Sequence, residues 1–150
     1  MTATLETIKA KQAELNSMIK ELQRDICPIY VIPEATLDMK PGERYAGLIL
    51  DDGGDPSYHL VLLPGEAEGV TWKDAKAFAK SAGGELPTRR EQSLLFANLK
   101  GQFKEAYYWS GEQHAADSDF AWCQSFNYGY QDDDDTDNEL RARAVRRSVI

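Results

Sequence analysis

Cysteine and histidine are both scarce in this chain, which contains two residues of each. Cys27 and Cys123 lie too far apart to form the Cys-x-x-Cys spacing of a zinc or redox site. His59 and His114 form neither a His-x-His nor a His-Glu-x-x-His pattern. The sequence therefore predicts no transition-metal site and no cofactor, and its low cysteine content is typical of a reducing, cytoplasmic setting.

Long apolar runs are also missing. No stretch approaches the roughly 18 apolar residues that cross a bilayer, and no basic segment followed by an apolar one opens the chain, so we expect no signal peptide. Basic residues are outnumbered, with 17 Lys and Arg against 25 Asp and Glu and a net charge of -8. Such a charge disfavours direct binding to nucleic acid or to a membrane. A protein partner or a surface ligand is the expected contact.

Residues 4–25 are expected to form one helix, because they contain neither Pro nor Gly and are rich in Ala, Glu, Lys, Gln and Leu. Apolar residues recur alternately every three and four positions, which is the heptad pattern of a coiled coil. The seam contains Leu5, Ile8, Gln12, Leu15, Ile19, Leu22 and Ile26. A lone helix of this length is marginal in water, so its apolar stripe needs a partner. We favour a homo-oligomer, either a dimer or a trimer; the alternative is that the helix packs on its own domain.

Pro28 is expected to end this helix, because the residue before a proline avoids helical backbone angles. The chain is thus divided into an N-terminal amphipathic helix over residues 1–27 and a domain over residues 28–150. Within the domain, residues 29–42 are expected to be extended and to supply a first strand and a connector.

Helices flanked by strands are predicted for the rest of the domain. Strand-like runs at 45–51 and 58–63 are separated by Asp-Gly-Gly-Asp-Pro, which predicts a hairpin. Thr71 and Thr88 can each cap the first turn of a following helix, and Glu91 lies at the capping-box position after Thr88. The helices are expected over 71–82 and 88–99, and later strands over 107–110, 120–126 and 140–145. A turn is expected at Asn127-Tyr128-Gly129. This order predicts an α+β domain.

Four segments in the second half of the chain carry a resemblance to a known family. They are Gly84–Glu91 (Gly-Glu-Leu-Pro-Thr-Arg-Arg-Glu), Tyr108–Glu112 (Tyr-Trp-Ser-Gly-Glu), Ala121–Trp122 and Arg141–Arg146 (Arg-Ala-Arg-Ala-Val-Arg). In this order they resemble a lectin-like family related to the C-terminal domain of the collagen-like bacterial adhesin, which is common in phages and prophages. The resemblance covers about residues 70–147.

The resemblance implies a C-type-lectin-like fold with two helices and a mostly antiparallel sheet. In similar folds, such as phage receptor-binding proteins, the ligand lies between the Trp-Ser strand and the last strand. Formylglycine-generating enzymes share this architecture, but their catalytic cysteine pair has no counterpart that we can place in this sequence.

We expect no catalysis. Ser110 lacks the Gly-x-Ser-x-Gly elbow of a serine hydrolase, and Cys123 is expected to be a small buried side chain and not a nucleophile. The expected function is that of a phage or prophage protein that binds a host or virion partner. The alternative is a small intracellular phage effector that inhibits a host protein through an acidic face. Either protein would act in the bacterial cytoplasm or in the virion.

The expected binding face surrounds residues 132–139, a segment too acidic for a simple connector. A solvated loop, a contact loop for a basic partner and a calcium site are all open interpretations of it. Two arginines of the last strand are expected to neutralise this loop, with anion binding as the alternative. The predicted contact residues are Tyr128, Tyr130, Asp132, Asp133, Asp134, Asp135, Asp137, Arg141 and Arg143.

Two further expectations concern aromatic and basic side chains. Trp109 and Trp122 are expected in the core, because each indole ring can bury a large area. Arg89 and Arg90 lie at a helix start, where a cation is poorly placed for the helix dipole. We therefore expect them to pair with Glu91 or with the acidic segment.

Overall fold

The computed structural model describes residues 4–26 and 29–150, except for the side chain of Ile26. The expectations that rest on Cys27, on Pro28 and on the Ile26 side chain lie outside the described residues. The chain consists of two units, residues 1–34 and residues 35–150. None of the helices in the described residues is both long and apolar enough to cross a membrane.

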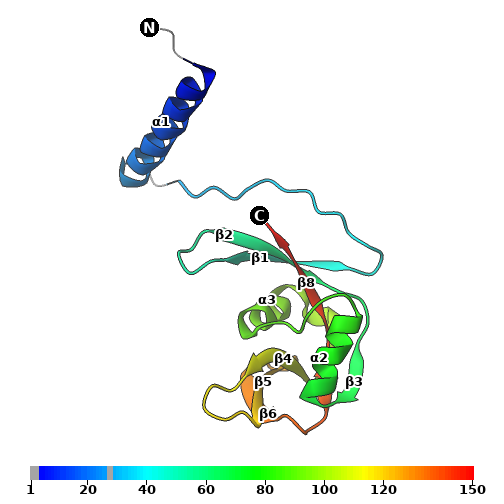
Figure 1. Cartoon of the computed structure of the whole chain (residues 1–150). Coiled ribbons are helices and arrows are strands. Elements are labelled where there is room, and N and C mark those ends of the chain that lie inside the picture. Colours follow the sequence, from blue (N-terminus) through cyan, green and yellow to red (C-terminus); the bar gives the residue numbers. More distant parts are fainter. Residues whose placement is uncertain (1–3, 27–28) are drawn as a thin grey trace. The chain divides into compact units, whose positions relative to one another are not determined.

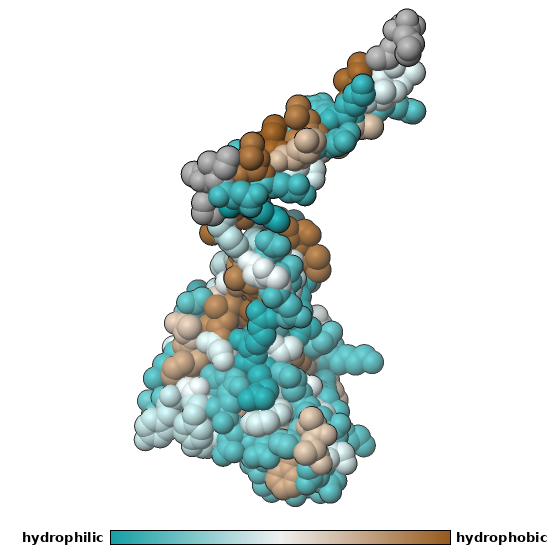
Figure 2. Space-filling model, turned by 90° about the vertical axis from the view of Figure 1, so that its left-hand side faces the viewer, coloured by the Kyte–Doolittle hydropathy of each residue, from teal (hydrophilic) through white to brown (hydrophobic). Residues whose placement is uncertain are grey.

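In its described residues, the first unit contains one helix, α1 (Leu5–Ile26), which confirms the predicted helix. The Thr4 hydroxyl accepts the backbone N–H of Thr7 at 3.2 Å and caps its first turn. The described apolar residues of the seam are 43% to 66% exposed, and Gln12 is exposed as well. Figure 2 shows apolar side chains gathered along one side of this helix. A stripe of this kind, left in water, is what a coiled-coil partner would bury.

We expect the full chain to be a dimer or a trimer, and Leu15→Asp together with Leu22→Asp to give a monomer. Each substitution places a charge in the apolar seam, where burial of an unpaired charge is costly. Multi-angle light scattering measures the mass.

The matched control for this experiment is Ala10→Asp together with Ser17→Asp. It adds the same two charges at heptad positions opposite the seam and should leave the mass unchanged. If the seam variant keeps the wild-type mass, α1 is not the interface.

The second unit holds two sheets and two α-helices (Figure 1). Strands β1 (Arg44–Leu50), β2 (Pro56–Leu62) and β8 (Val145–Val149) form an antiparallel sheet in the order β1-β2-β8. The five-stranded sheet has the order β3-β7-β4-β5-β6, with β3 (Ala67–Val70), β7 (Leu140–Ala142), β4 (Tyr107–Gln113), β5 (Phe120–Ser125) and β6 (Gln131–Asp135). Only the β4–β7 pair is parallel. The α+β fold class with a mostly antiparallel arrangement is confirmed.

Helices α2 (Trp72–Ser81) and α3 (Arg89–Leu99) cover opposite faces of the five-stranded sheet. Consecutive residues of β4 point to opposite faces. Trp109 therefore packs with Ala75 and Ala79 of α2, and Tyr108 packs with Leu95 of α3. The second of these clusters also includes residues of β1 and β2, so α3 lies between the two sheets (Figure 1).

Three expectations about strands were wrong. The chain over 29–42 contains no strand, and the first strand begins at Arg44. A short strand, β3, was not predicted, and neither was β6. The expected last strand over 140–145 is divided between the two sheets, since β7 ends at Ala142 and β8 begins at Val145. The backbone of Ala144 accepts the N–H of Leu63 at 2.9 Å at this crossing.

The carboxylate of Glu91 is the main polar link within this unit. It is fully buried and belongs to the predicted capping box, in which it accepts the N–H of Thr88 at 2.8 Å. It also accepts the hydroxyl of Tyr58 at 2.6 Å and two bonds from the guanidinium of Arg147, at 2.7 and 2.8 Å. Glu91 therefore joins α3 to β2 and to β8.

Burial alone would raise the pKa of Glu91, but the bonds from Arg147, Tyr58 and Thr88 outweigh it and lower the pKa below 4.5. Because the pKa is lower in the folded state, the linked stability is present at neutral pH and is lost as the pH falls below the unfolded value of 4.5.

We expect Glu91→Gln to lower the free energy of unfolding at neutral pH by about 3–5 kcal/mol, because it leaves Arg147 without its buried partner. Urea denaturation at a series of pH values measures this difference, which should shrink in acid. The control is Glu85→Gln, which removes an exposed partner of the same arginine and should cost less than about 1 kcal/mol. Equal costs for the two variants would contradict the role given to Glu91.

Candidate functional site

The turn between β5 and β6 presents two tyrosines at the surface. Gly129 has a φ of 87°, and a Cβ at this position would lie 2.7 Å from the ring of Phe96, so only glycine fits. Its N–H donates to the carbonyl of Ser125 at 2.8 Å, and the Ser125 hydroxyl accepts the N–H of Tyr128 at 3.2 Å. The turn that the Asn-Tyr-Gly sequence predicts is thus held in one conformation.

Tyr128 and Tyr130, here called the tyrosine pair, are 77% and 48% exposed. Their rings stack with centroids 6.5 Å apart and an interplanar angle of 17°. The hydroxyl of Tyr130 also contacts the hydroxyl of Tyr107 on β4. The pair is a pre-formed aromatic surface that a partner can cover without ordering the side chains.

The acidic segment begins as a strand, not as the loop that its composition predicts. β6 runs antiparallel to β5, with Trp122 opposite Asp133 and Phe120 opposite Asp135. It is the last strand of its sheet, and we call residues 132–135 the acidic edge. Aspartate is depleted in strands, which is why composition favoured a loop.

The aspartates of the acidic edge accept hydrogen bonds from the backbone N–H groups that β6 leaves unpaired on its outer side. Thr136 donates its N–H towards β5, so strand alternation directs the N–H groups of Asp133 and Asp135 away from it. The carboxylate of Asp132 accepts the N–H of Asp133 at 2.9 Å, and the carboxylate of Asp134 accepts the N–H of Asp135 at 2.8 Å. Charge and self-capping together protect an edge from pairing with a foreign strand.

The carboxylates of this segment do not converge on one point. Neighbouring side chains of a strand leave on opposite faces. Asp134 accepts the side-chain amide of Asn138 at 2.7 Å, whereas Asp133 lies 3.8 Å from the ring of His114. In the described part of the chain, no group of three or more His, Cys, Asp or Glu residues could hold a metal ion. The calcium interpretation gains no support.

The two arginines expected beside the acidic edge lie elsewhere, so this part of the predicted site was wrong. Arg141 pairs with Glu66 at 2.8 Å and with Glu68 at 2.9 Å. Arg143 is buried, and its guanidinium donates to the carbonyls of Leu63 and Gln102. The partners of Arg141 follow β2, and those of Arg143 follow β2 and α3. These partners are distant in the sequence, so the spacing of residues could not predict the pairing.

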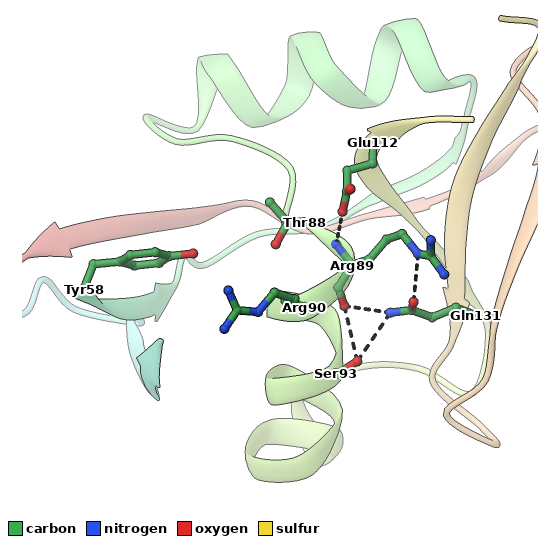
Figure 3. Close-up of a pocket in the computed structure, with 7 residues that line it drawn as sticks. All are labelled: Tyr58, Thr88, Arg89, Arg90, Ser93, Glu112 and Gln131. Atoms are coloured by element: carbon green, nitrogen blue, oxygen red, sulfur yellow. Dashed lines mark hydrogen bonds between the residues drawn. The ribbon is translucent and has the colours of Figure 1, made fainter. Parts of the chain in front are cut away.

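A cavity of about 530 Å³ lies next to the acidic edge, beside the start of α3 (Figure 3). We call it the arginine cleft. Its lining consists of Tyr58, Thr88, Arg89, Arg90, Ser93, Glu112 and Gln131. These side chains supply guanidinium, hydroxyl, amide and carboxylate groups but neither an imidazole nor a thiol. The set suits recognition through hydrogen bonds.

Arg89 and Gln131 tie the cleft to the acidic edge. The Nε of Arg89 donates to the Gln131 side chain at 3.0 Å, and the Gln131 amide donates to the Arg89 carbonyl at 2.7 Å (Figure 3). The N–H of Arg89 donates to the carboxylate of Glu112 at 2.6 Å. Arg90 reaches the carbonyl of Leu50 at 2.8 Å. The expected pairing of these two arginines with Glu91 or with the aspartates was therefore wrong.

Trp122 is only partly buried, which corrects the expectation that it lies in the core. Its neighbours Ala121 and Cys123 enter the core, so alternation along β5 directs the indole to the other face. There the guanidinium of Arg89 lies 3.6 Å from the ring centroid, and the ring of His114 stacks on it at 5.2 Å. Trp109, in contrast, is fully buried as expected.

Cys123 is 2% exposed, and its thiol donates to the carbonyl of Asp132 at 3.4 Å. Burial, reinforced by the carboxylates of Asp134, Asp132 and Asp133, raises the pKa of this thiol to about 12. A thiol with this pKa forms almost no thiolate at neutral pH and is a poor nucleophile.

The two helices, the mixed sheet and the aromatic β4–β5 hairpin define a C-type-lectin-like domain, as the resemblance implied. The family model of the FGE-sulfatase domain, described as the sulfatase-modifying factor enzyme 1-like domain, matches residues 63–147, and the chain belongs to this family. The matched region contains the acidic edge and Cys123. It also contains every residue that lines the arginine cleft except Tyr58. No curated protein matches the chain.

We expect Trp109→Ala to lower the free energy of unfolding by about 3–5 kcal/mol, because it empties a fully buried site. Trp122→Ala should cost only about 1–2 kcal/mol, since the indole there loses a partly exposed stack of a cation and an imidazole. Urea denaturation of both variants gives the comparison. Equal losses would place Trp122 in the core after all.

We expect Cys123 to resist thiol reagents until the protein unfolds. In a Cys27→Ser variant Cys123 is the single thiol, and its reaction with Ellman's reagent at mildly alkaline pH can be followed by absorbance. The native protein should react slowly, and the same protein in denaturant should react at once. Rapid reaction of the native protein would show that Cys123 is accessible and could act as a nucleophile.

Proposed function

We propose that the chain is a non-catalytic recognition protein whose lectin-like domain binds a protein partner through the tyrosine pair and the acidic edge. The observation that carries this proposal is the tyrosine pair itself, two large aromatic side chains exposed on a fixed turn. Tyrosine is enriched at interfaces, where it supplies rigid contact area with little loss of conformational entropy.

The absence of catalysis in this proposal is supported by the state of Cys123. In the arginine cleft, the polar groups of Arg89, Glu112 and Gln131 already hold one another in place. The thiol is buried, and its raised pKa keeps it protonated. Membership of a family that includes enzymes therefore does not by itself give this chain a nucleophile.

Multivalency is the second part of the proposal. A dimer or trimer formed through the heptad seam of α1 would carry two or three copies of the lectin-like domain. Linked copies bind a multivalent target far more tightly than one copy, because later contacts form within the complex. Weak contacts through each tyrosine pair would then suffice.

The setting that we propose is a phage or prophage, with a host or virion partner, and it rests on the motif resemblance. The acidic edge favours a second candidate function, that of an intracellular phage effector that inhibits a host protein with a basic surface. Contacts made by exposed carboxylates weaken as salt is added, because their charges are screened. Binding that depends on the acidic edge should therefore be the more sensitive to salt.

The test is capture of partners from a bacterial lysate by the immobilised full chain. Tyr128→Ala with Tyr130→Ala should abolish capture, and changing Asp132–Asp135 to Asn should weaken it and flatten its dependence on salt. Quantitative mass spectrometry of the retained proteins measures both effects.

The control is Tyr45→Ala, which removes a tyrosine that is 47% exposed on the other sheet. It should leave capture unchanged, and circular dichroism checks that every variant is folded. If the tyrosine and aspartate variants retain the same partner with the same salt dependence, the proposed face is wrong.

A further inference from the structure

Arg143 is a buried cation whose hydrogen bonds go to uncharged groups. It is 8% exposed, and its Nη1 and Nη2 donate to the carbonyls of Gln102 and Leu63 at 2.6 and 2.8 Å. Its Nε–H has no hydrogen-bond partner among the described residues. Burial lowers the pKa of this guanidinium. A buried charge without an opposite charge bonded to it is costly, so this position calls for an anion.

A cavity of about 330 Å³ borders this guanidinium, and we call it the Arg143 cavity. It lies between the segment after β2 and the segment after α3. Its lining consists of Gly65, Glu66, Gly101, Gln102, Phe103, Lys104 and Arg143. The Cζ of Arg143 lies 5.4 Å from the centre of the Phe103 ring, which gives the cavity an apolar wall beside its cation. Its volume is in the range of sites for small molecules.

The one carboxylate in the lining is already engaged. Oε2 of Glu66 accepts a bond from Arg141 at 2.8 Å, and Oε1 accepts the hydroxyl of Tyr108. Arg141 is shared with the exposed Glu68. The lining holds one carboxylate, Glu66, and two cations, Arg143 and Lys104. Outside the lining, Arg141 and Glu68 neutralise each other, which leaves one positive charge unbalanced at the cavity.

We propose that the Arg143 cavity binds a small monocarboxylate, which accepts hydrogen bonds from the guanidinium hydrogens that the two carbonyls leave free. The planar guanidinium matches the two oxygens of a carboxylate. A single negative charge balances the cavity, whereas a dianion would be repelled by Glu66. The apolar part of the ligand lies against Phe103, and Lys104 attracts the anion at the rim. This site is separate from the tyrosine pair and does not depend on the proposed function.

Titration with sodium acetate, at constant ionic strength and followed by ¹H–¹⁵N correlation spectra of the arginine side chains, tests the proposal on the full chain. The Nε–H signal of Arg143, assigned from its loss in Arg143→Lys, should shift and saturate at millimolar acetate. The signal of Arg44, an exposed arginine on β1, should stay in place. Lys104→Ala, which leaves the buried residues intact, should weaken acetate binding by about two- to fivefold, as expected for one exposed ion pair.

Acetamide, sodium chloride and inorganic phosphate are the comparison ligands. Acetamide and chloride should produce no saturable shift, and phosphate should bind more weakly than acetate. If Arg143→Lys does not fold, the Lys104→Ala comparison and the ligand series still decide the matter. A flat acetate titration, an equal response to chloride or acetamide, or tighter binding of phosphate would each overturn the proposal.

Discussion

The burial of the Glu91 carboxylate is the constraint on which the placement of α3 against β2 and β8 depends. One pair of oxygens completes the cap of α3, holds Tyr58 of β2 and binds Arg147 of β8. The helix start so fixed carries Arg89, whose contacts with Gln131 and Trp122 set one wall of the arginine cleft. A buried charge with all its partners in place favours one arrangement of helix and sheets, because any other would leave the carboxylate unpaired.

Much of the fold follows from local sequence signals. The Thr88 and Glu91 pair predicts the start of α3, Asp-Gly-Gly-Asp-Pro predicts the first hairpin, and the motif around Trp109 predicts β4. What sequence could not give is long-range: the capping-box glutamate shows nothing of its partner Arg147, 56 residues away. The division of residues 140–149 between two sheets has the same cause, since the crossing at Ala144 depends on a backbone contact with Leu63.

For the candidate site, the sequence predicts the turn that carries the two tyrosines, but not the strand that the aspartates form or the partners of the two arginines. Tyr128 and Tyr130 flank a glycine turn that local sequence identifies. Both are exposed, and their contact with a partner stays a prediction. Asp132 to Asp135 were assigned to a loop because their strand propensity is low, yet pairing with β5 and capping by their own side chains outweigh that propensity. Arg141 and Arg143 were misplaced because their partners follow β2 and α3, far away in the sequence.

The position of β6 at the end of its sheet has a consequence for how this protein can change over generations. β6 pairs with β5 alone and contributes no residue to either core cluster. Substitutions at its outward positions therefore alter the surface without disturbing the packing on which folding depends, provided that each new side chain still blocks the open edge. The outward side chains of this strand, and Tyr128 in the neighbouring turn, can therefore diverge between related sequences, while Gly129 and the scaffold beneath them stay the same.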